Sequence, residues 1–294
     1  MNLNLEKGEA RTPGGQWFPV TVVDRSFPIF ESESGMLYVI PCFNETGIPF
    51  AAECIKEPVK AKRNSPVLLT GDPGLGKSTV INSIAQVIDP NITHEFNTFT
   101  IEEFDERYQS NPYGNAAKGI FSQSNMDESA HAIYGPEYLE MEQRILAKNL
   151  IISRIKEQIA YFATPKWKLL NPHVRNLVTT WIHVKEPEYY LPGLAILKVA
   201  PPYRQNEYMA AKYWEPFCAF TFPPLRNKLW QEYEARKVVF VNNCLKDSGE
   251  DKTGSWIKNV VFNLHKRGMI QEEIAEIIGR DRSRVSRYLS QPLH

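Results

Sequence analysis

One short segment of the chain combines the residue types and the spacing that phosphate binding requires. The segment consists of Gly71, Asp72, Pro73, Gly74, Leu75, Gly76, Lys77 and Ser78. It fits the pattern GxxxxGK[ST] in full. Glycines allow successive backbone N–H groups to turn inward around an anion, the lysine supplies positive charge for the β- and γ-phosphates, and the serine hydroxyl can ligate Mg²⁺. Together with Thr79, the segment predicts a nucleotide-binding loop for ATP and Mg²⁺.

The residues on either side of this loop support the prediction. The run VLLT at 67–70 is typical of a buried strand. After the loop, apolar residues recur at helical spacing, at Val80, Ile81, Ile84, Ala85 and Ile88. A helix that begins at the loop points the positive end of its dipole at the bound phosphates. The sequence therefore predicts a strand, a phosphate-binding loop and a helix in that order.

Hydrolysis of ATP would also need carboxylates, one for Mg²⁺ and usually a second to polarise the attacking water. Asp127 and Glu128 are the first candidates, Asp127 as a metal ligand and Glu128 as the carboxylate that polarises the water. The segment before them, GIFSQSNM, is unusually polar for a central parallel strand. Asp105 and Glu106 are the alternative pair, although IEEFDERY resembles an amphipathic helix. That neither pair is catalytic also remains open.

Apolar runs alternate with helical patterns from residue 67 to about 200, as in an α/β sheet. The candidate strands are 67–70, 96–100, 159–164, 181–184 and 195–199. Residues 1–60 are expected to form an irregular, β-rich N-terminal region of unknown role. We expect the ATPase domain at 61–246 and a small all-α domain at 251–294.

The last segment has the pattern of a helix-turn-helix. Ala275, Gly279 and Val285 have the spacing that such a unit needs at the helix crossing, the turn and the second helix. The second helix would present its polar residues to double-stranded DNA. These residues are Arg280, Arg282, Ser283, Arg284, Ser286 and Arg287. A three-helix module that binds protein is the alternative.

In these pieces the chain resembles the Zot-type P-loop ATPases of filamentous-phage assembly proteins and of archaeal and archaeal-virus relatives in the FtsK-HerA group. The resemblance covers about residues 65–240. It rests on Asp127-Glu128, on Arg154 before the strand that ends at Thr164, on the segment 169–177, and on FPPLRNKLWQEYEARK. It implies a RecA-like sheet, ATP hydrolysis, DNA handling and a homo-oligomer.

The resemblance also suggests roles for single residues. Arg154 would bind the γ-phosphate or sense the bound nucleotide at a subunit interface. A salt bridge on the helix surface explains Arg154 equally well. Thr164 would position the attacking water, or it is simply a residue that packs well in a strand. Arg175 lies on an expected helix and is better explained as a structural charge.

Composition limits the classes of function. The formal net charge is +0, so any contact with DNA must come from a local basic patch. No apolar run is long enough to cross a membrane, the N-terminus lacks a secretory h-region, and the 4 cysteines form no CxxC pair. We therefore expect a cytoplasmic, DNA-associated ATPase. A nucleotide-gated DNA-binding regulator with little turnover is the alternative. A third interpretation, an export ATPase at a membrane, is not supported, because the sequence contains no membrane-spanning segment.

Overall fold

The structure is a computed structural model. It describes residues 3–4, 6–23, 29–31, 37–127, 156–167, 172–185, 193–199, 214–247, 261–262, 265, 270–277 and 281–290. The chain divides into two compact units, Met1–Trp230 and Gln231–His294, which are described separately below.

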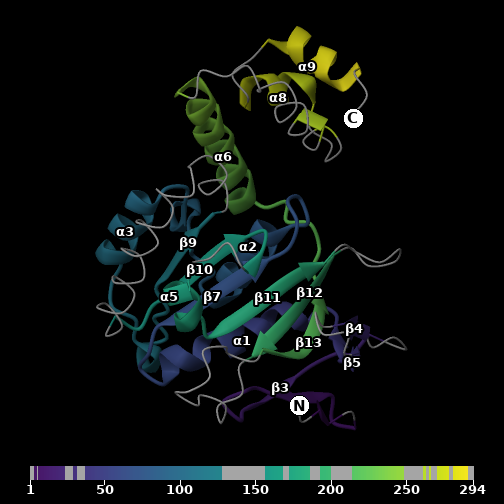
Figure 1. The fold of residues 1–294 in the computed structure, drawn as a ribbon, viewed down its shortest axis with the longest axis vertical. Helices are drawn as coiled ribbons and strands as arrows, with labels where there is room; N and C mark the ends of the chain where they lie inside the picture. The colour runs from purple at the N-terminus through teal and green to yellow at the C-terminus, as the bar shows by residue number, and fades with distance from the viewer. Residues whose placement is uncertain are drawn as a thin grey trace. The chain divides into compact units, whose positions relative to one another are not determined.

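The first unit is built on an eight-stranded, mostly parallel sheet, within the residues described (Figure 1). The strand order is β6-β13-β12-β11-β7-β10-β9-β8. These strands are β6 (Cys42–Phe43), β7 (Ser65–Thr70), β8 (Asn97–Thr98), β9 (Gln123–Met126), β10 (Ile159–Thr164), β11 (Thr180–Lys185), β12 (Leu194–Val199) and β13 (Glu215–Thr221). Strands β8, β9, β10, β7 and β11 run parallel, whereas β12 is antiparallel to both of its neighbours.

Strand β7 lies between β10 and β11, and every one of its residues is buried. A strand covered on both faces is expected to be apolar throughout, which explains the unbroken run Val67–Leu69. Val67 and Leu69 pack on one face of the sheet, while Leu68 packs on the other.

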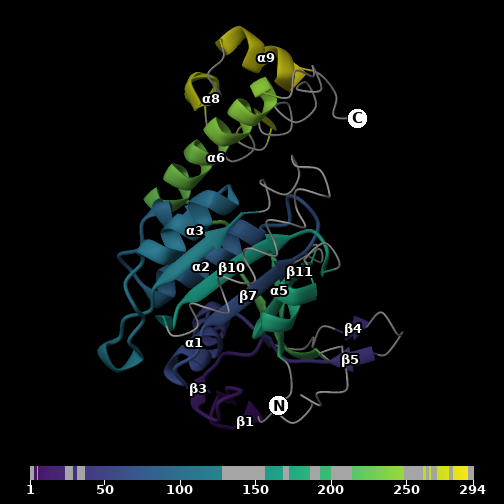
Figure 2. The same ribbon diagram turned by 60° about the vertical axis from the view of Figure 1, so that its left-hand side comes forward.

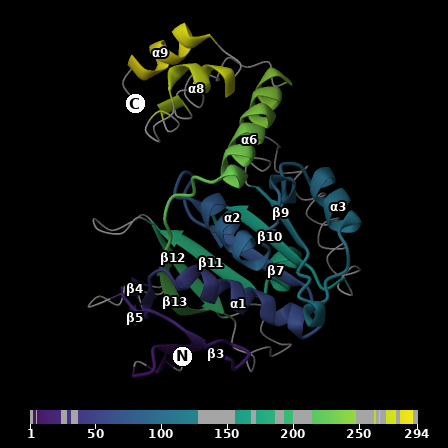
Figure 3. The ribbon, with the colours of Figure 1, turned by 180° about the vertical axis from the view of Figure 1, so that it is seen from behind.

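Helices cover both faces of the sheet. Helices α1 (Gly47–Lys60) and α2 (Lys77–Ile88) pack on one face, as the view from behind shows (Figure 3). Helices α3 (Ile101–Ser110) and α5 (Pro172–Leu177) belong to the opposite face (Figures 1 and 2). The short turns η1 (His94–Phe96) and η2 (Ala116–Lys118) complete the described helical elements of this unit apart from the start of α6. A mixed α/β sheet flanked by helices is compatible with a Rossmann- or RecA-like fold.

The predicted strands agree with the structure except at one edge. Strand β10 has the predicted bounds, and β7, β11 and β12 each extend the predicted run by one or two residues. The strand predicted at 96–100 shrinks to the two residues of β8, because Phe96 closes η1 and Thr100 caps α3 by accepting a hydrogen bond from the Glu103 N–H (3.1 Å).

The N-terminal sixty residues differ from the expected β-rich region. They do contain short strands, β1 (Leu3–Asn4), β2 (Glu9–Arg11), β3 (Trp17–Pro19), β4 (Ile29–Glu31) and β5 (Leu37–Val39). However, residues 47–60 form helix α1, because apolar residues recur there at helical spacing and are buried against the main sheet. Strand β6 pairs with β13 and so extends that same sheet.

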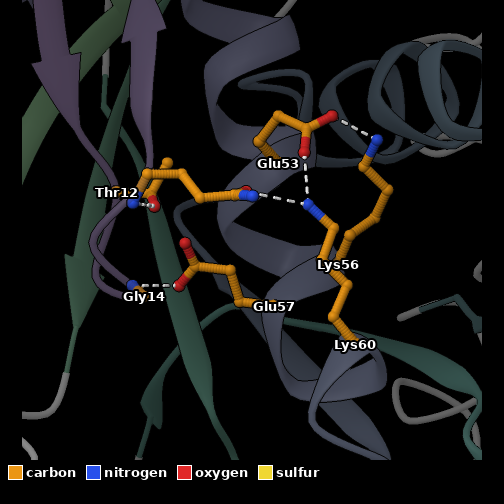
Figure 4. Close-up of polar contacts among 7 residues, drawn as sticks. Thr12, Gly14, Glu53, Lys56, Glu57 and Lys60 are labelled. Carbon is orange, nitrogen blue, oxygen red and sulfur yellow. Dashed lines mark hydrogen bonds and ion pairs between the residues drawn. The ribbon is translucent and has the colours of Figure 1, made fainter. Parts of the chain in front are cut away.

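Polar contacts attach the N-terminal segment to α1 (Figure 4). The Glu57 carboxylate accepts a hydrogen bond from the backbone N–H of Gly14 (2.5 Å), and burial raises the pKa of Glu57. One turn away, Lys60 Nζ lies 2.9 Å from Glu53, which also pairs with Lys56. Burial alone would raise the pKa of Glu53, but hydrogen bonds and charges from these two lysines outweigh it and lower that pKa.

The second unit is helical where the structure describes it. It contains most of α6 (Lys228–Asp247), together with α8 (Gln271–Ile277) and α9 (Arg282–Ser290). Its core consists of buried apolar residues from all three helices and from residue 261, with Tyr288 and Leu289 packed against them. The buried members are Val238, Val261, Ile274, Ala275 and Val285.

Candidate functional site

The segment 71–78 forms a loop between β7 and α2 whose backbone only glycine adopts readily. Gly71, Gly74 and Gly76 have φ angles of 144°, 87° and 96°. At Gly71 a side chain would also collide with the sheet, since an added Cβ would lie 2.4 Å from the carbonyl oxygen of Val184. The outer arc of the loop, formed by Asp72, Pro73 and Gly74, is exposed.

Lys77 is the first residue of α2, and its side chain is folded over the loop. Only 6% of the residue is exposed. Its ammonium group donates to the carbonyl oxygens of Gly71 (2.7 Å) and Asp72 (3.1 Å). Ser78 is half-buried and Thr79 is buried. A glycine-rich loop with an exposed outer arc at a helix N-terminus, with a lysine beside it, suits a bound phosphate.

Two of the other predicted residues lie at the same edge of the sheet as the loop. Asp127 follows β9 directly and is 1% exposed, and its backbone N–H bonds to the Thr98 carbonyl (3.0 Å). Thr164 is the last residue of β10 and pairs in register with Thr70, the last residue of β7. Because these strands are parallel, Asp127 and Thr164 share the carboxyl edge with the loop, with β10 between β7 and β9. Glu128 and Arg154 lie outside the described residues.

The alternative acids occupy a different kind of position. Asp105 and Glu106 lie within α3, as the amphipathic pattern predicted, and not at the end of a strand. The Asp105 carboxylate accepts a hydrogen bond from the Gln109 side chain (2.8 Å), and Glu106 is exposed.

The polar composition of β9 has a structural explanation. All four residues of β9 are buried, and two of them bond toward α2. The Asn125 amide donates to Asn97 (2.7 Å), and the Asn97 amide donates in turn to Asn82 on α2 (3.1 Å). Gln123 donates to the Ala85 carbonyl (3.1 Å). Buried polar groups are tolerated when they are hydrogen-bonded in this way.

A further side chain at this edge was not predicted from the sequence. His183 lies on β11 in register with Thr70, and its Nδ1 is 2.9 Å from the Thr70 hydroxyl. Trp181, two residues earlier, donates its indole N–H to the same hydroxyl (2.7 Å). Burial, assisted by the charges of Lys198 and Lys185, lowers the pKa of His183 to about 4, although Asp72 acts in the opposite sense. The only sequence signal was a histidine inside the strand predicted at 181–184.

Trp181 belongs to a cluster of three tryptophans, which we call the tryptophan cluster and which consists of Trp167, Trp181 and Trp214. The rings of Trp167 and Trp181 stack with centroids 4.7 Å apart, and Trp214 lies edge-on to both. Lys198 Nζ lies 3.7 Å from the centre of the Trp181 ring. A cation so placed is attracted by the ring, which fixes the ring further.

In the second unit, the predicted DNA-contacting residues that the structure describes lie on α9. Ser283, Arg284, Ser286 and Arg287 are exposed, whereas Val285 is buried in the core. Arg282 pairs with Glu272 of α8 (2.8 Å), with both side chains more than half exposed. Arg280 lies outside the described residues. A helix that exposes several polar and cationic side chains suits a contact with nucleic acid.

Arg175 lies on α5, as predicted, with its guanidinium 5.9 Å from the centre of the Trp167 ring. This placement agrees with a structural charge. Among the described residues, no cluster of histidine, cysteine, aspartate and glutamate is arranged to hold a metal ion. No helix in the described part of the chain has the length and apolar character needed to cross a membrane.

Comparison of the chain with models of known protein families finds no match, and comparison with curated proteins finds none either.

Proposed function

We propose that the chain is a DNA-associated ATPase that couples binding and hydrolysis of Mg-ATP to DNA handling. The observation that carries this proposal is the loop 71–78. It connects a fully buried central strand to a helix, it takes glycine-only conformations, and Lys77 folds over it. In this proposal the β-phosphate binds backbone N–H groups of the loop. Lys77 then exchanges its carbonyl partners for phosphate oxygens, which carry full negative charge.

Ser78 and Asp127 are the residues that would hold Mg²⁺. They supply a hydroxyl and a carboxylate, the oxygen donors that Mg²⁺ prefers. When bound, Mg²⁺ neutralises the charge that develops on the phosphates. The buried position of Asp127 at the carboxyl edge of β9, in the same sheet as the loop, supports this assignment.

Glu128 would polarise the attacking water, because it is the carboxylate that follows Asp127 in the sequence. Thr164 would orient that water, since β10 lies between the strand of the loop and the strand of the acids. The Thr164 hydroxyl bonds weakly to the Lys166 carbonyl (3.4 Å) and can exchange that partner. Arg154 keeps its proposed role as a γ-phosphate ligand or subunit-interface residue.

The link to DNA rests on the second unit. Helices α8 and α9 pack through Ile274, Ala275 and Val285, the positions expected of a helix-turn-helix core, while the serines and arginines of α9 remain exposed. We propose that this unit binds double-stranded DNA and tethers the ATPase to it. The mostly parallel sheet flanked by helices is compatible with the RecA-like fold that the Zot-type resemblance implies, and the same resemblance suggests a homo-oligomer.

A nucleotide-gated DNA-binding regulator with little turnover is the second candidate. The polar composition of β9 would favour this candidate if the buried side chains of β9 lacked hydrogen-bond partners. Because Asn125 and Gln123 bond toward α2, the polarity of β9 no longer argues against catalysis.

The test is steady-state ATP turnover with and without duplex DNA. Lys77→Ala should abolish nucleotide binding or turnover, while the exposed-lysine control Lys118→Ala should behave as wild type. Glu128→Gln should bind ATP but turn over at least ~100-fold more slowly, the scale of losing a general base. Tight ATP binding by the wild type without turnover, with or without DNA, would favour the regulator. Unchanged ATP affinity and turnover in Lys77→Ala would refute the nucleotide site.

A further inference from the structure

Three side chains form a hydrogen-bonded chain at the point where β7 enters the loop. Trp181 Nε1 lies 2.7 Å from Thr70 Oγ1, and Thr70 Oγ1 lies 2.9 Å from His183 Nδ1. Thr70 is the residue immediately before Gly71, whose carbonyl oxygen accepts from Lys77. We refer to Trp181, Thr70 and His183 as the Thr70 relay.

The chemistry of the donors sets the direction of the Thr70 relay. An indole N–H can only donate, so the Thr70 hydroxyl oxygen accepts from Trp181. The pKa of His183, lowered to about 4 by burial and by nearby lysines, keeps the imidazole neutral at neutral pH. Within the described residues the Thr70 hydroxyl has no other acceptor, so its proton is directed to Nδ1 of His183. The imidazole proton then resides on Nε2.

The same point of the loop is held from both neighbouring strands. On one side the Gly71 N–H bonds to the carbonyl of Pro165, just after β10 (3.2 Å). On the other side the Val184 carbonyl on β11 leaves no room for a Cβ at Gly71. The Thr70 relay adds a third restraint through the side chain of the residue before the glycine.

Trp181 itself is well anchored. Its ring stacks on Trp167, meets Trp214 edge-on, and lies under the ammonium group of Lys198. The tryptophan cluster therefore fixes the direction of the Trp181 N–H. Because this N–H bonds to the Thr70 hydroxyl, it also fixes the side chain of Thr70 at the end of β7.

We propose that Trp181 and His183 are positioning residues for the nucleotide loop. Acting through Thr70, they orient the Gly71 carbonyl and hold the loop in the shape that receives phosphate. This inference rests on the proposed function. It has a physical corollary: when Lys77 leaves the Gly71 carbonyl for a phosphate, the environment of Thr70 changes, and the hydrogen-bonded indole of Trp181 reports that change in its fluorescence.

The experiment compares ATP binding by calorimetry with the intrinsic fluorescence response to Mg-ATP. Thr70→Val removes the hydroxyl and retains the β-branched shape, whereas Thr70→Ser retains the hydroxyl. Trp181→Phe removes the N–H donor, and Trp17→Phe is the control at an exposed tryptophan of β3. The melting temperature of each variant is measured in parallel.

We expect Thr70→Val and Trp181→Phe to weaken ATP binding by about 3- to 10-fold, the range for losing one neutral hydrogen bond. Thr70→Val should also lose the fluorescence response when saturated with ATP. Thr70→Ser should keep both properties, and Trp17→Phe should keep wild-type affinity. If Thr70→Val fails to fold, Trp181→Phe carries the test of affinity.

Two results would contradict the inference. Lower melting temperatures with wild-type affinity and an unchanged fluorescence response would show that the Thr70 relay only stabilises the sheet. That result would leave the proposed function intact. A wild-type protein that binds no ATP would overturn both the proposed function and this inference.

Discussion

Substitution of Gly71 by alanine tests how tightly the loop is built into the sheet. The φ angle of Gly71 is 144°, a conformation that costs a non-glycine residue on the order of 1–3 kcal/mol. The new Cβ would also lie 2.4 Å from the Val184 carbonyl oxygen, much closer than the ordinary contact range of 3.4–4 Å. Relieving such an overlap in a packed region costs a further ~1–3 kcal/mol. Gly71→Ala should therefore lower the free energy of unfolding by about 2–6 kcal/mol.

Gly74→Ala is the matched control for this prediction. Gly74 also has a positive φ (87°), but nothing lies within 4 Å of an added Cβ. Gly74→Ala should therefore lose only the free energy of unfolding that the unfavourable φ angle costs, about 1–3 kcal/mol. Urea unfolding followed by circular dichroism measures both variants, and equal m-values would show that the denatured states are comparable. If the free energy of unfolding fell equally in Gly71→Ala and Gly74→Ala, the contact with Val184 would impose no steric cost, which would refute the reasoning.

Three further predictions follow from other parts of the chain. Because the pKa of Glu57 is raised by burial, its contribution to stability is present below its ordinary value of 4.5 and is lost as pH rises through the folded-state pKa. Urea unfolding at several pH values should therefore show that the stability of Glu57→Gln increases relative to the wild type as pH rises. A difference in the free energy of unfolding that does not change with pH would contradict this. Asn97→Ala leaves the buried side chains of Asn82 and Asn125 without this partner and should lower the free energy of unfolding by about 2–6 kcal/mol. Gln109→Ala removes an exposed hydrogen bond and should change the free energy of unfolding by less than ~0.5 kcal/mol. Replacing both Arg284 and Arg287 with alanine should lower the slope of log affinity for duplex DNA against log salt by roughly two units if both contact phosphate, and an unchanged slope would place the DNA contact elsewhere.

The bonds made by β9 alter what can be inferred from its sequence. Central parallel strands are usually apolar, so Gln123 and Asn125 argue against a central strand when the sequence is considered alone. In the fold their amides reach α2, the helix that begins at Lys77, directly or through Asn97. The rule fails here because it treats a buried amide as costly, and that cost falls once the amide finds a partner. Those partners lie far away in the sequence.

The amino-acid sequence by itself determined the loop 71–78, the strand before it and the helix after it, because glycine, lysine and apolar periodicity act over a few residues. The same local signals located β10 and α3, and the buried positions Ala275 and Val285. Helix α1 was missed although its apolar spacing is visible in the sequence, because glycine and proline breaks dominate its surroundings.

Only the tertiary structure decided which strands are neighbours. The placement of β10 between β7 and β9 brings Thr164 into register with Thr70, and the pairing of β11 with β7 brings His183 to the same residue. These contacts join residues about a hundred positions apart along the chain. They depend on parallel crossover connections and on register, and neither property is encoded in any single segment.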